Sequence, residues 1–228
     1  MGNSEEEGNV MKLLTAALDL LFPPKCPFCR RVLKDSRAPL CSQCQPLLPW
    51  LEKKEAFRKV DHTSGCWSPL VYKDTVRECV HRYKFTPIPA YGKPLGLLVA
   101  QCVLDHPEIT PDVVTWAPLS RKSLKKRGFD QARLLAEEVG RSLNLPVESL
   151  LEKSRETQQQ SLLETPSQRK ANTLGAYRLR GGTNVEGKRI LLVDDVLTSG
   201  ATLGACALTL KQGGAGEVYC ATLAQAGK

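Results

Sequence analysis

Short apolar runs alternate along this chain with segments in which apolar residues recur every three or four positions. Runs rich in β-branched and aliphatic residues predict strands at residues 112–117, 176–180, 190–193 and 217–223. Helical spacing of apolar residues is found in four segments, at residues 74–83, 95–104, 132–139 and 203–210. Strands that alternate with helices predict an α/β fold with a parallel sheet flanked by helices. Residues 217–223 are expected to form the strand that closes this sheet. Ligands of such sheets bind at the carboxyl ends of the strands.

The first 22 residues have a different pattern. Residues 1–10 are polar and acidic, which predicts a disordered tail. Residues 11–22 begin with a lysine and an apolar run, as signal peptides do, but Asp19 interrupts the run and no small-x-small cleavage site follows. We interpret this segment as an amphipathic helix that packs against the body of the protein. No apolar run in the chain is long enough to span a bilayer.

Two C-x-x-C pairs follow this segment. Cys26, Cys29, Cys41 and Cys44 have the spacing of a tetrahedral zinc site, and residues 30–40 between the pairs are expected to form a short hairpin. Four cysteine ligands leave no open coordination position, so the predicted Zn²⁺ is structural. A redox-active dithiol is the alternative, and His62 or Cys66 could extend the ribbon. The predicted domains are residues 11–60, with helix and zinc ribbon, and residues 61–228.

Composition and charge restrict the setting and the partners. The chain has 228 residues, of which 42% are hydrophobic and 25% are charged, as in a globular protein. Its nine cysteines form an odd number, which favours metal binding in a reducing cytoplasm over a secreted disulfide framework. The formal net charge of +8 favours phosphorylated or polyanionic partners.

The most informative segment is residues 190–202, I-L-L-V-D-D-V-L-T-S-G-A-T, which we call the signature stretch. A buried strand is expected to end at Asp194 and Asp195, and a loop rich in hydroxyl groups then leads into a helix. Unpaired N–H groups at a helix N-terminus bind phosphate, and Gly200 allows the backbone to approach the anion. The two carboxylates are suited to accept hydrogen bonds from vicinal ribose hydroxyls or to hold a hydrated Mg²⁺. The pattern therefore predicts a sugar-phosphate site.

The signature stretch resembles that of the type I phosphoribosyltransferases, which use 5-phosphoribosyl-1-pyrophosphate (PRPP). This resemblance implies that Asp194 and Asp195 bind the ribose hydroxyls and that the loop binds the 5′-phosphate. The implied binding residues are Asp194, Asp195, Val196, Leu197, Thr198, Ser199, Gly200, Ala201 and Thr202. A Walker-type nucleotide triphosphatase is the competing interpretation, because the sequence of residues 182–188 nearly matches a P-loop motif. That glycine-rich stretch leads into a strand and opens no helix, so we interpret it as a turn.

A basic cluster follows the strand at 112–117. It consists of Arg121, Lys122, Lys125, Lys126 and Arg127. Because the cluster follows a strand end in the same sheet, it is expected near the signature stretch. It could hold pyrophosphate together with Ser120, track a nucleic-acid backbone, or form a solvated face.

Several further motifs resemble the ComF/GntX family, which has a type I phosphoribosyltransferase-like domain and an N-terminal zinc ribbon. They are Tyr83-Lys84-Phe85, Pro118-Leu119, Arg127-Gly-Phe-Asp-Gln131, Arg155-x-Thr-x-x-Gln160-x-x-Leu163 and Arg169-x-x-Asn172. This chain has Asp130 where the family usually has Asn, Ser199 where Thr is commoner, and only Cys66 where many members carry a second cysteine pair.

The resemblance implies that residues 152–173 form a mobile lid over the active site. Arg155 and Arg169 would reach pyrophosphate, and they join Asp194 and Asp195 as the expected catalytic residues. A plain polar loop is the alternative.

Two functions follow from the family resemblance. One is a phosphoribosyltransferase that binds Mg²⁺–PRPP or another ribose 5-phosphate compound and transfers the sugar to an acceptor that the sequence does not identify. The other is a non-catalytic accessory of DNA uptake in natural competence, which binds single-stranded DNA or a translocase partner. The two are compatible, because a PRPP-type pocket can serve as a sensor.

Overall fold

The computed structural model describes residues 23–86, 88–155, 165, 172–173 and 175–227. The predicted tail at residues 1–10 and the predicted helix at residues 11–22 lie outside these ranges. None of the described helices is long and apolar enough to cross a lipid bilayer.

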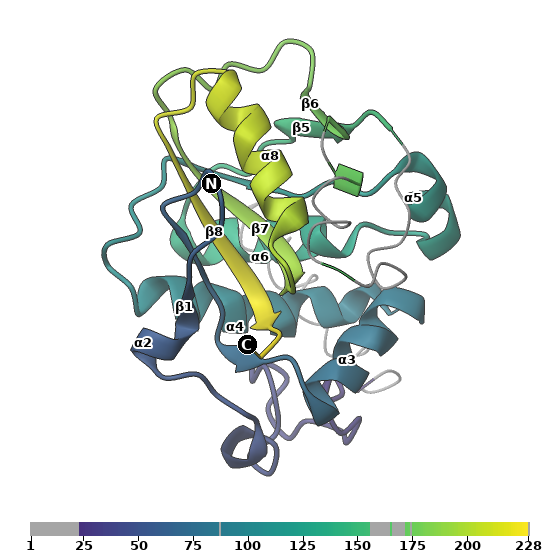
Figure 1. Cartoon of the computed structure of the whole chain (residues 1–228). Coiled ribbons are helices and arrows are strands. Elements are labelled where there is room, and N and C mark those ends of the chain that lie inside the picture. The colour runs from purple at the N-terminus through teal and green to yellow at the C-terminus, as the bar shows by residue number, and fades with distance from the viewer. Residues whose placement is uncertain (1–22, 87, 156–164, 166–171, 174, 228) are drawn as a thin grey trace, which may run out of the picture.

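A mostly parallel sheet forms the centre of the protein (Figure 1). Its strand order is β1-β2-β8-β7-β4, and β3 also pairs with β8. The strands are β1 (Phe57–Arg58), β2 (Gly65–Trp67), β3 (Leu70–Val71), β4 (Val113–Trp116), β7 (Arg189–Leu197) and β8 (Glu217–Gln225). Only the short edge strand β1 is antiparallel to its neighbour, β2. Because β1 pairs with β2, the sheet begins at residue 57, within the segment assigned to the ribbon domain.

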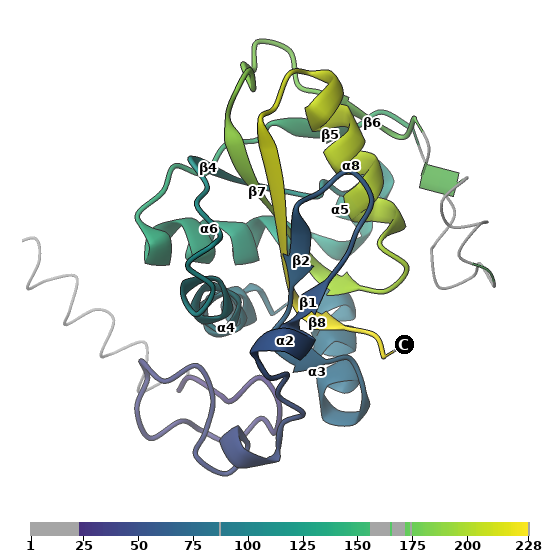
Figure 2. The same ribbon diagram turned by 60° about the vertical axis from the view of Figure 1, so that its left-hand side comes forward.

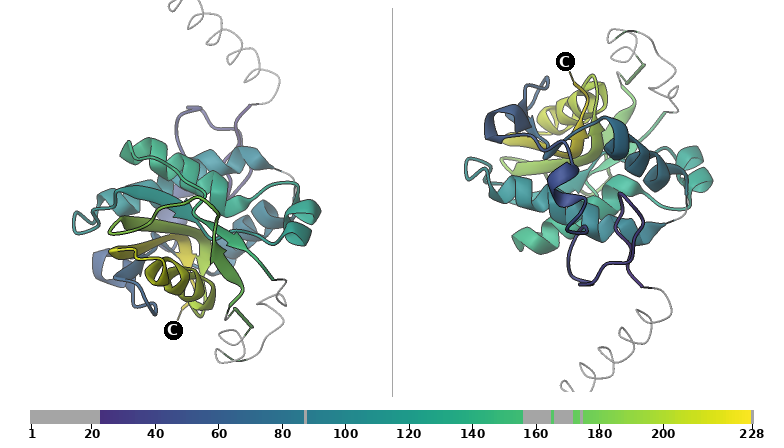
Figure 3. Two further views of the ribbon diagram at one scale, coloured as in Figure 1. Left: turned by 90° about the horizontal axis from the view of Figure 1, so that it is seen from above. Right: turned by 90° about the horizontal axis from the view of Figure 1, so that it is seen from below.

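Helices cover both faces of this sheet (Figure 3). On one face lie α4 (Gly92–Leu104) and α6 (Gln131–Leu143), and on the other lies α8 (Ala201–Gln212). Successive residues of β7 point to opposite faces, so Leu191 and Val193 pack on the α4 and α6 side while Ile190 and Leu192 pack on the α8 side. A strand buried on both faces is apolar throughout, which is why this one was recognisable.

The four helices predicted between residues 74 and 210 are present. Besides α4, α6 and α8, the chain forms α3 (Asp74–Phe85), whose predicted apolar face of Val76, Val80 and Tyr83 is fully buried. The basic cluster itself forms a short helix, α5 (Arg121–Arg127). The remaining short elements are η1 (Gln45–Leu47), α2 (Lys53–Ala56) and η2 (Pro89–Tyr91).

Three sequence expectations are wrong in detail. The strand at 190–193 does not end at the acidic pair, because β7 continues to Leu197 in register with β8. Strand β8 does not close the sheet, since it lies between β7 and β2. The strand at 176–180 forms β6 (Tyr177–Leu179), which pairs with β5 (Leu151–Lys153) in a separate antiparallel sheet.

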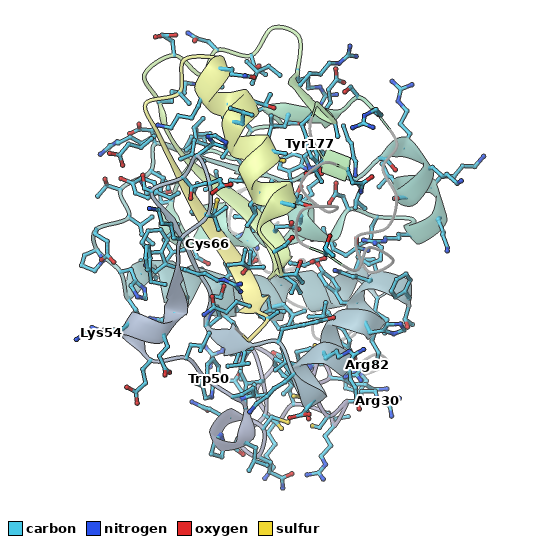
Figure 4. All side chains as sticks on the ribbon, viewed as in Figure 1. Arg30, Trp50, Lys54, Cys66, Arg82 and Tyr177 are labelled. Atoms are coloured by element: carbon cyan, nitrogen blue, oxygen red, sulfur yellow. The ribbon has the colours of Figure 1, made fainter. Side chains whose placement is uncertain are left out.

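The zinc ribbon lies at one end of the domain, next to α3 (Figure 2). Residues 30–40 form turns and bends instead of the predicted hairpin, and a single bridge between Lys25 and Val32 closes the first cysteine turn. Arg82 of α3 joins the ribbon to the body, because its guanidinium donates hydrogen bonds to the carbonyl oxygens of Pro27 and Phe28 at 2.9 and 2.8 Å. Figure 4 shows Arg82 on the side of α3 that faces the ribbon.

Candidate functional site

The acidic pair lies inside the last part of β7, where pairing with β8 fixes its position. Asp194 is opposite Thr222 of β8, and Asp195 is 7% exposed. The backbone N–H of Asp195 donates a hydrogen bond to Oδ1 of Asp194 at 2.8 Å, so the first carboxylate folds back on its own strand. Burial and the charge of Asp195 raise the pKa of Asp194 to about 7. The pKa of the Asp194 carboxyl group is therefore shifted toward neutral pH.

A lysine from a distant helix completes the acidic pair. Nζ of Lys84, in the last turn of α3, lies 2.8 Å from Oδ1 of Asp195, and the two side chains are only 23% and 11% exposed. Burial alone would lower the pKa of Lys84, but the Asp195 carboxylate raises it above its ordinary value. Lys84 has no predicted role, although it lies in one of the motifs that carry the family resemblance.

The loop after β7 leads into the N-terminus of α8. Gly200 is the N-cap residue and has a φ of 77°, a left-handed conformation that glycine adopts without strain. The first turn of α8 contains no acidic side chain, so the partial positive charge of this helix end faces no competing carboxylate within the helix. Residues 196–203 line one small hollow together with Asp194. The loop predicted to bind phosphate is therefore beside the acidic pair.

Ser120 and Asp130 organise the basic segment. The Ser120 hydroxyl accepts a hydrogen bond from the backbone N–H of Ser123 and caps α5, which ends at Gly128 with a φ of 81°. Asp130 caps α6 by accepting from Arg133 N–H, and its other oxygen accepts from Leu119 N–H, each at 3.3 Å. Asp130, which departs from the family pattern, thus fixes both ends of the segment.

Arg127 is the residue of the basic cluster that the structure places near Lys84. Its guanidinium lies 5.6 Å from the centre of the Phe85 ring and donates to Oε1 of Gln131 at 2.9 Å. It is close enough to Lys84 for its charge to oppose protonation of that lysine and so lower the pKa. The side-chain nitrogen of Gln131 is buried, and no described residue accepts its hydrogen bond. Arg121, Lys122, Lys125 and Lys126 are exposed on α5.

Apart from residue 165, the structure describes only the ends of the expected lid at residues 152–173. Glu152 and Lys153 belong to β5, so the first lid residues form a strand. Arg155 donates to the carbonyl oxygen of Asn172 at 3.3 Å, and the Thr173 hydroxyl donates to the carbonyl oxygen of Ala201 at 3.2 Å. The segment therefore returns to the N-terminus of α8. Arg169 lies outside the described residues.

The four ribbon cysteines form a site that fits zinc. Their Sγ atoms all lie within 4.8 Å of one another, and those of Cys29 and Cys41 are 3.5 Å apart. Tetrahedral Zn–S bonds of about 2.3 Å would separate the sulfurs by about 3.8 Å. His62 and Cys66 are not part of this cluster. Cys66 is fully buried in β2, and Figure 4 shows it in the sheet, away from the ribbon.

The protein offers fewer ligands for Mg²⁺ than for zinc. Within the described ranges, the ribbon is the only group of three or more potential metal ligands. Asp194 and Asp195 already accept a backbone hydrogen bond and the Lys84 ammonium, respectively. This donor set fits an ion that keeps its waters and is held mainly by substrate phosphates. Proteins usually bind Mg²⁺ in this way when their substrate carries phosphate groups.

Comparison with known proteins agrees with this architecture. Residues 125–228 match the family model of the phosphoribosyl transferase domain, and residues 17–55 match that of the double zinc ribbon domain. The fold is also similar to that of the glutamine PRPP amidotransferase from B. subtilis, with a TM-score of 0.42 and 24% identity over 61% of this chain and 29% of that chain.

Curated relatives match over most of their length. The chain is 30% identical to the DNA utilization protein YhgH of Salmonella typhi, over 86% of this chain and 88% of the relative. It is 27% identical to competence protein F of Haemophilus influenzae, covering 90% and 98%, and 29% identical to competence protein ComFC of Bacillus subtilis, covering 91% and 87%. The chain belongs to the ComF/GntX family, with a type I phosphoribosyltransferase-like domain and an N-terminal zinc ribbon.

Proposed function

We propose that this protein binds Mg²⁺–PRPP or a related ribose 5-phosphate compound at the carboxyl end of β7. The observation that carries the proposal is the order of groups along one strand, loop and helix. A carboxylate pair is followed by a left-handed glycine and then by a helix N-terminus whose first turn has no acidic side chain. The helix N-terminus suits a phosphate, and the carboxylates suit neutral hydroxyls on the same ligand.

In this binding mode the 5′-phosphate lies against residues 198–202, and the ribose hydroxyls donate to Asp194 and Asp195. The pyrophosphate points toward Arg127, with Ser120, Arg121, Arg155 and Arg169 as further contacts. When bound, Mg²⁺ would be held by the phosphate oxygens and would neutralise part of their charge.

If the protein is a transferase, pyrophosphate leaves from C1′ and a nucleophile attacks an oxocarbenium-like centre. The protein then contributes position and charge: the loop anchors the ribose, and the arginines stabilise the departing anion. Ligand sensing without transfer uses the same contacts and needs no acceptor.

Calorimetry with ribose 5-phosphate and with Mg²⁺–PRPP tests this proposal. The wild type is compared with the double variant Asp194→Asn/Asp195→Asn, and Asp112→Asn at the opposite end of the sheet is the control. Charge-assisted hydrogen bonds contribute about 1.5–3 kcal/mol each, so the double variant should bind at least about tenfold more weakly. Its far-ultraviolet circular dichroism spectrum should be unchanged. Unchanged affinity refutes the role of the pair, and a wild type that binds neither ligand refutes the proposal.

The second candidate is a DNA-uptake function in the cytoplasm, and exposed charge favours it. Arg121, Lys122, Lys125 and Lys126 form an exposed basic face on α5, and the relatives are named for competence and DNA utilization. Single-stranded DNA would bind there through its phosphates, or a translocase partner would contact the same helix. With 6% aromatic residues, the chain gives little support for a base-stacking platform.

Affinity for a labelled oligonucleotide across a salt series tests the DNA candidate. Phosphate contacts predict a steep fall in affinity with salt, and a smaller slope after neutralising α5. Binding that shows no salt dependence, or that survives neutralisation of α5, counts against this function.

A further inference from the structure

Three consecutive residues at the end of α3 each contact a different part of the candidate site. The Tyr83 hydroxyl donates to the carbonyl oxygen of Gln131 at 3.0 Å, and the Phe85 ring lies against the Arg127 guanidinium. Lys84, between them, pairs with Asp195. The segment therefore touches both the acidic strand and the basic segment that flank the expected ligand.

The partial burial of Lys84, whose side chain is 23% exposed, requires an explanation because lysine side chains seldom lie away from water. Moving its ammonium group out of water is unfavourable unless an anion and hydrogen bonds compensate. Tyr83 anchors the last turn of α3 in the core, with no exposed surface, and this fixes where the next side chain goes. The partner of Lys84 is Asp195, a carboxylate of the signature stretch that lies 111 positions later in the chain. The fold therefore brings the positive charge of a distant residue to the ligand site.

The Lys84 ammonium group offsets the negative charge of the acidic pair. Asp194 and Asp195 are adjacent, poorly solvated and close to a loop suited to a dianionic phosphate. A carboxylate held by Lys84 through Oδ1 keeps its second oxygen as a hydrogen-bond acceptor, and its charge repels the phosphate less.

We propose that Lys84 is a positioning residue of the ribose-phosphate site, which holds the Asp195 carboxylate in the orientation that accepts a ribose hydroxyl. This inference rests on the proposed function. It predicts that Lys84 acts on the ribose part of the ligand through Asp195, without contacting the pyrophosphate.

Binding of three ligands to Lys84→Met separates these possibilities. Affinity for ribose 5-phosphate and for Mg²⁺–PRPP should fall by a similar factor, at least about tenfold, because a charge-assisted interaction is lost. Affinity for inorganic pyrophosphate should stay within twofold. A loss for PRPP and pyrophosphate but not for ribose 5-phosphate would mean direct contact with the diphosphate and overturns the proposal. Lys54→Met is the matched control, since Lys54 is exposed on α2 and points away from the body (Figure 4).

Two further variants test the route through Asp195 and exclude a purely structural effect. In an Asp195→Asn background, Lys84→Met should weaken ribose 5-phosphate binding by less than twofold, and a further tenfold loss contradicts the proposal. Lys84→Arg keeps the charge and should recover at least a third of the wild-type affinity. If it binds as weakly as Lys84→Met while both melt cooperatively, the role of the charge is refuted.

The same titrations distinguish this inference from the function on which it rests. A wild type that binds neither ribose 5-phosphate nor PRPP overturns the proposed function and this role with it. A wild type that binds both, beside a Lys84→Met variant that binds equally well, overturns the role of Lys84 alone.

Discussion

Replacing Asp194 with asparagine should stabilise the folded protein at pH 8 and weaken its binding of ribose 5-phosphate. The side chain is poorly solvated beside Asp195, which makes its ionised form unfavourable in the folded state. Asparagine removes the charge and keeps the Oδ1 that accepts the hydrogen bond from Asp195 N–H. A variant that gains stability as it loses ligand identifies a residue retained for function.

The size and the sign of the effect follow from the pKa of Asp194. Burial and the neighbouring charge raise this pKa from 3.8 to about 7 in the folded state. Between these two pH values the folded protein binds more protons than the unfolded chain, so stability decreases as the pH rises. The full displacement corresponds to at most about 4 kcal/mol, reached above pH 7 and absent below the unfolded pKa. The Asp194→Asn variant lacks this pH-dependent loss.

Urea unfolding at several pH values between 5 and 8.5, without Mg²⁺ or ligand, measures the effect. The variant should exceed the wild type in unfolding free energy by an amount that grows with pH and levels off above about 7. Asp112→Asn gives the opposite sign, because Arg189 lowers the pKa of Asp112 to about 2 and the carboxylate stabilises the fold throughout this range. If the difference between Asp194→Asn and wild type is the same at pH 5 and pH 8, the reasoning about burial is wrong.

Two other substitutions test separate parts of the structure. Cys26→Ser should reduce bound zinc, measured by mass spectrometry, from about one ion per chain to well below one. The ribbon of this variant should unfold, because so small a unit needs its metal. Full zinc content in the variant would contradict the four-cysteine assignment. Gly200→Ala should lower the unfolding free energy by about 1–2 kcal/mol, the cost of a left-handed conformation for alanine, since the new methyl group would meet Val60 only at an ordinary contact distance of 3.4 Å. It should also weaken ribose 5-phosphate binding in calorimetry, whereas Gly181→Ala, which has open space, should change neither property.

The fold was predictable where burial leaves a regular pattern. The apolar run at 190–193 and the helical spacing of Val76, Val80 and Tyr83 each reflect a face that is removed from water. The end of β7 was not predictable in this way. Asp194 and Asp195 interrupt the apolar pattern, but backbone pairing with β8 does not depend on side-chain polarity and carries the strand on to Leu197.

The short helix α5 had local signals that the charge run concealed. Ser120 is a good N-cap and Gly128 is a good residue to end a helix, and they bracket the basic segment. The run of lysines and arginines was interpreted only as a charged binding surface or solvated face, and no helix was predicted there. The signature loop shows the converse, because its motif predicted a loop that leads into a helix N-terminus although the predicted strand end was wrong.

Lys84 could not be placed from the sequence because its role depends on tertiary contact. Nothing within a few residues of Lys84 indicates a carboxylate partner, and Asp195 is 111 positions away. The motif at 83–85 was visible only as part of the family resemblance. The structure gives it a physical meaning, since one residue anchors the helix end, one pairs with the acidic strand and one stacks on Arg127.

The charges at the candidate site are costly unless they are matched by one kind of ligand. A phosphate alone would use the N-terminus of α8 but would be repelled by the acidic pair, and a neutral sugar would use the pair but leave the helix end unoccupied. A sugar phosphate satisfies both at once. Lys84 reduces the repulsion between the two halves of the site, because it brings positive charge to Asp195. The arrangement therefore predicts that ribose 5-phosphate binds more tightly than inorganic phosphate or ribose, and that the Asp194→Asn/Asp195→Asn variant loses this preference while retaining weak phosphate binding.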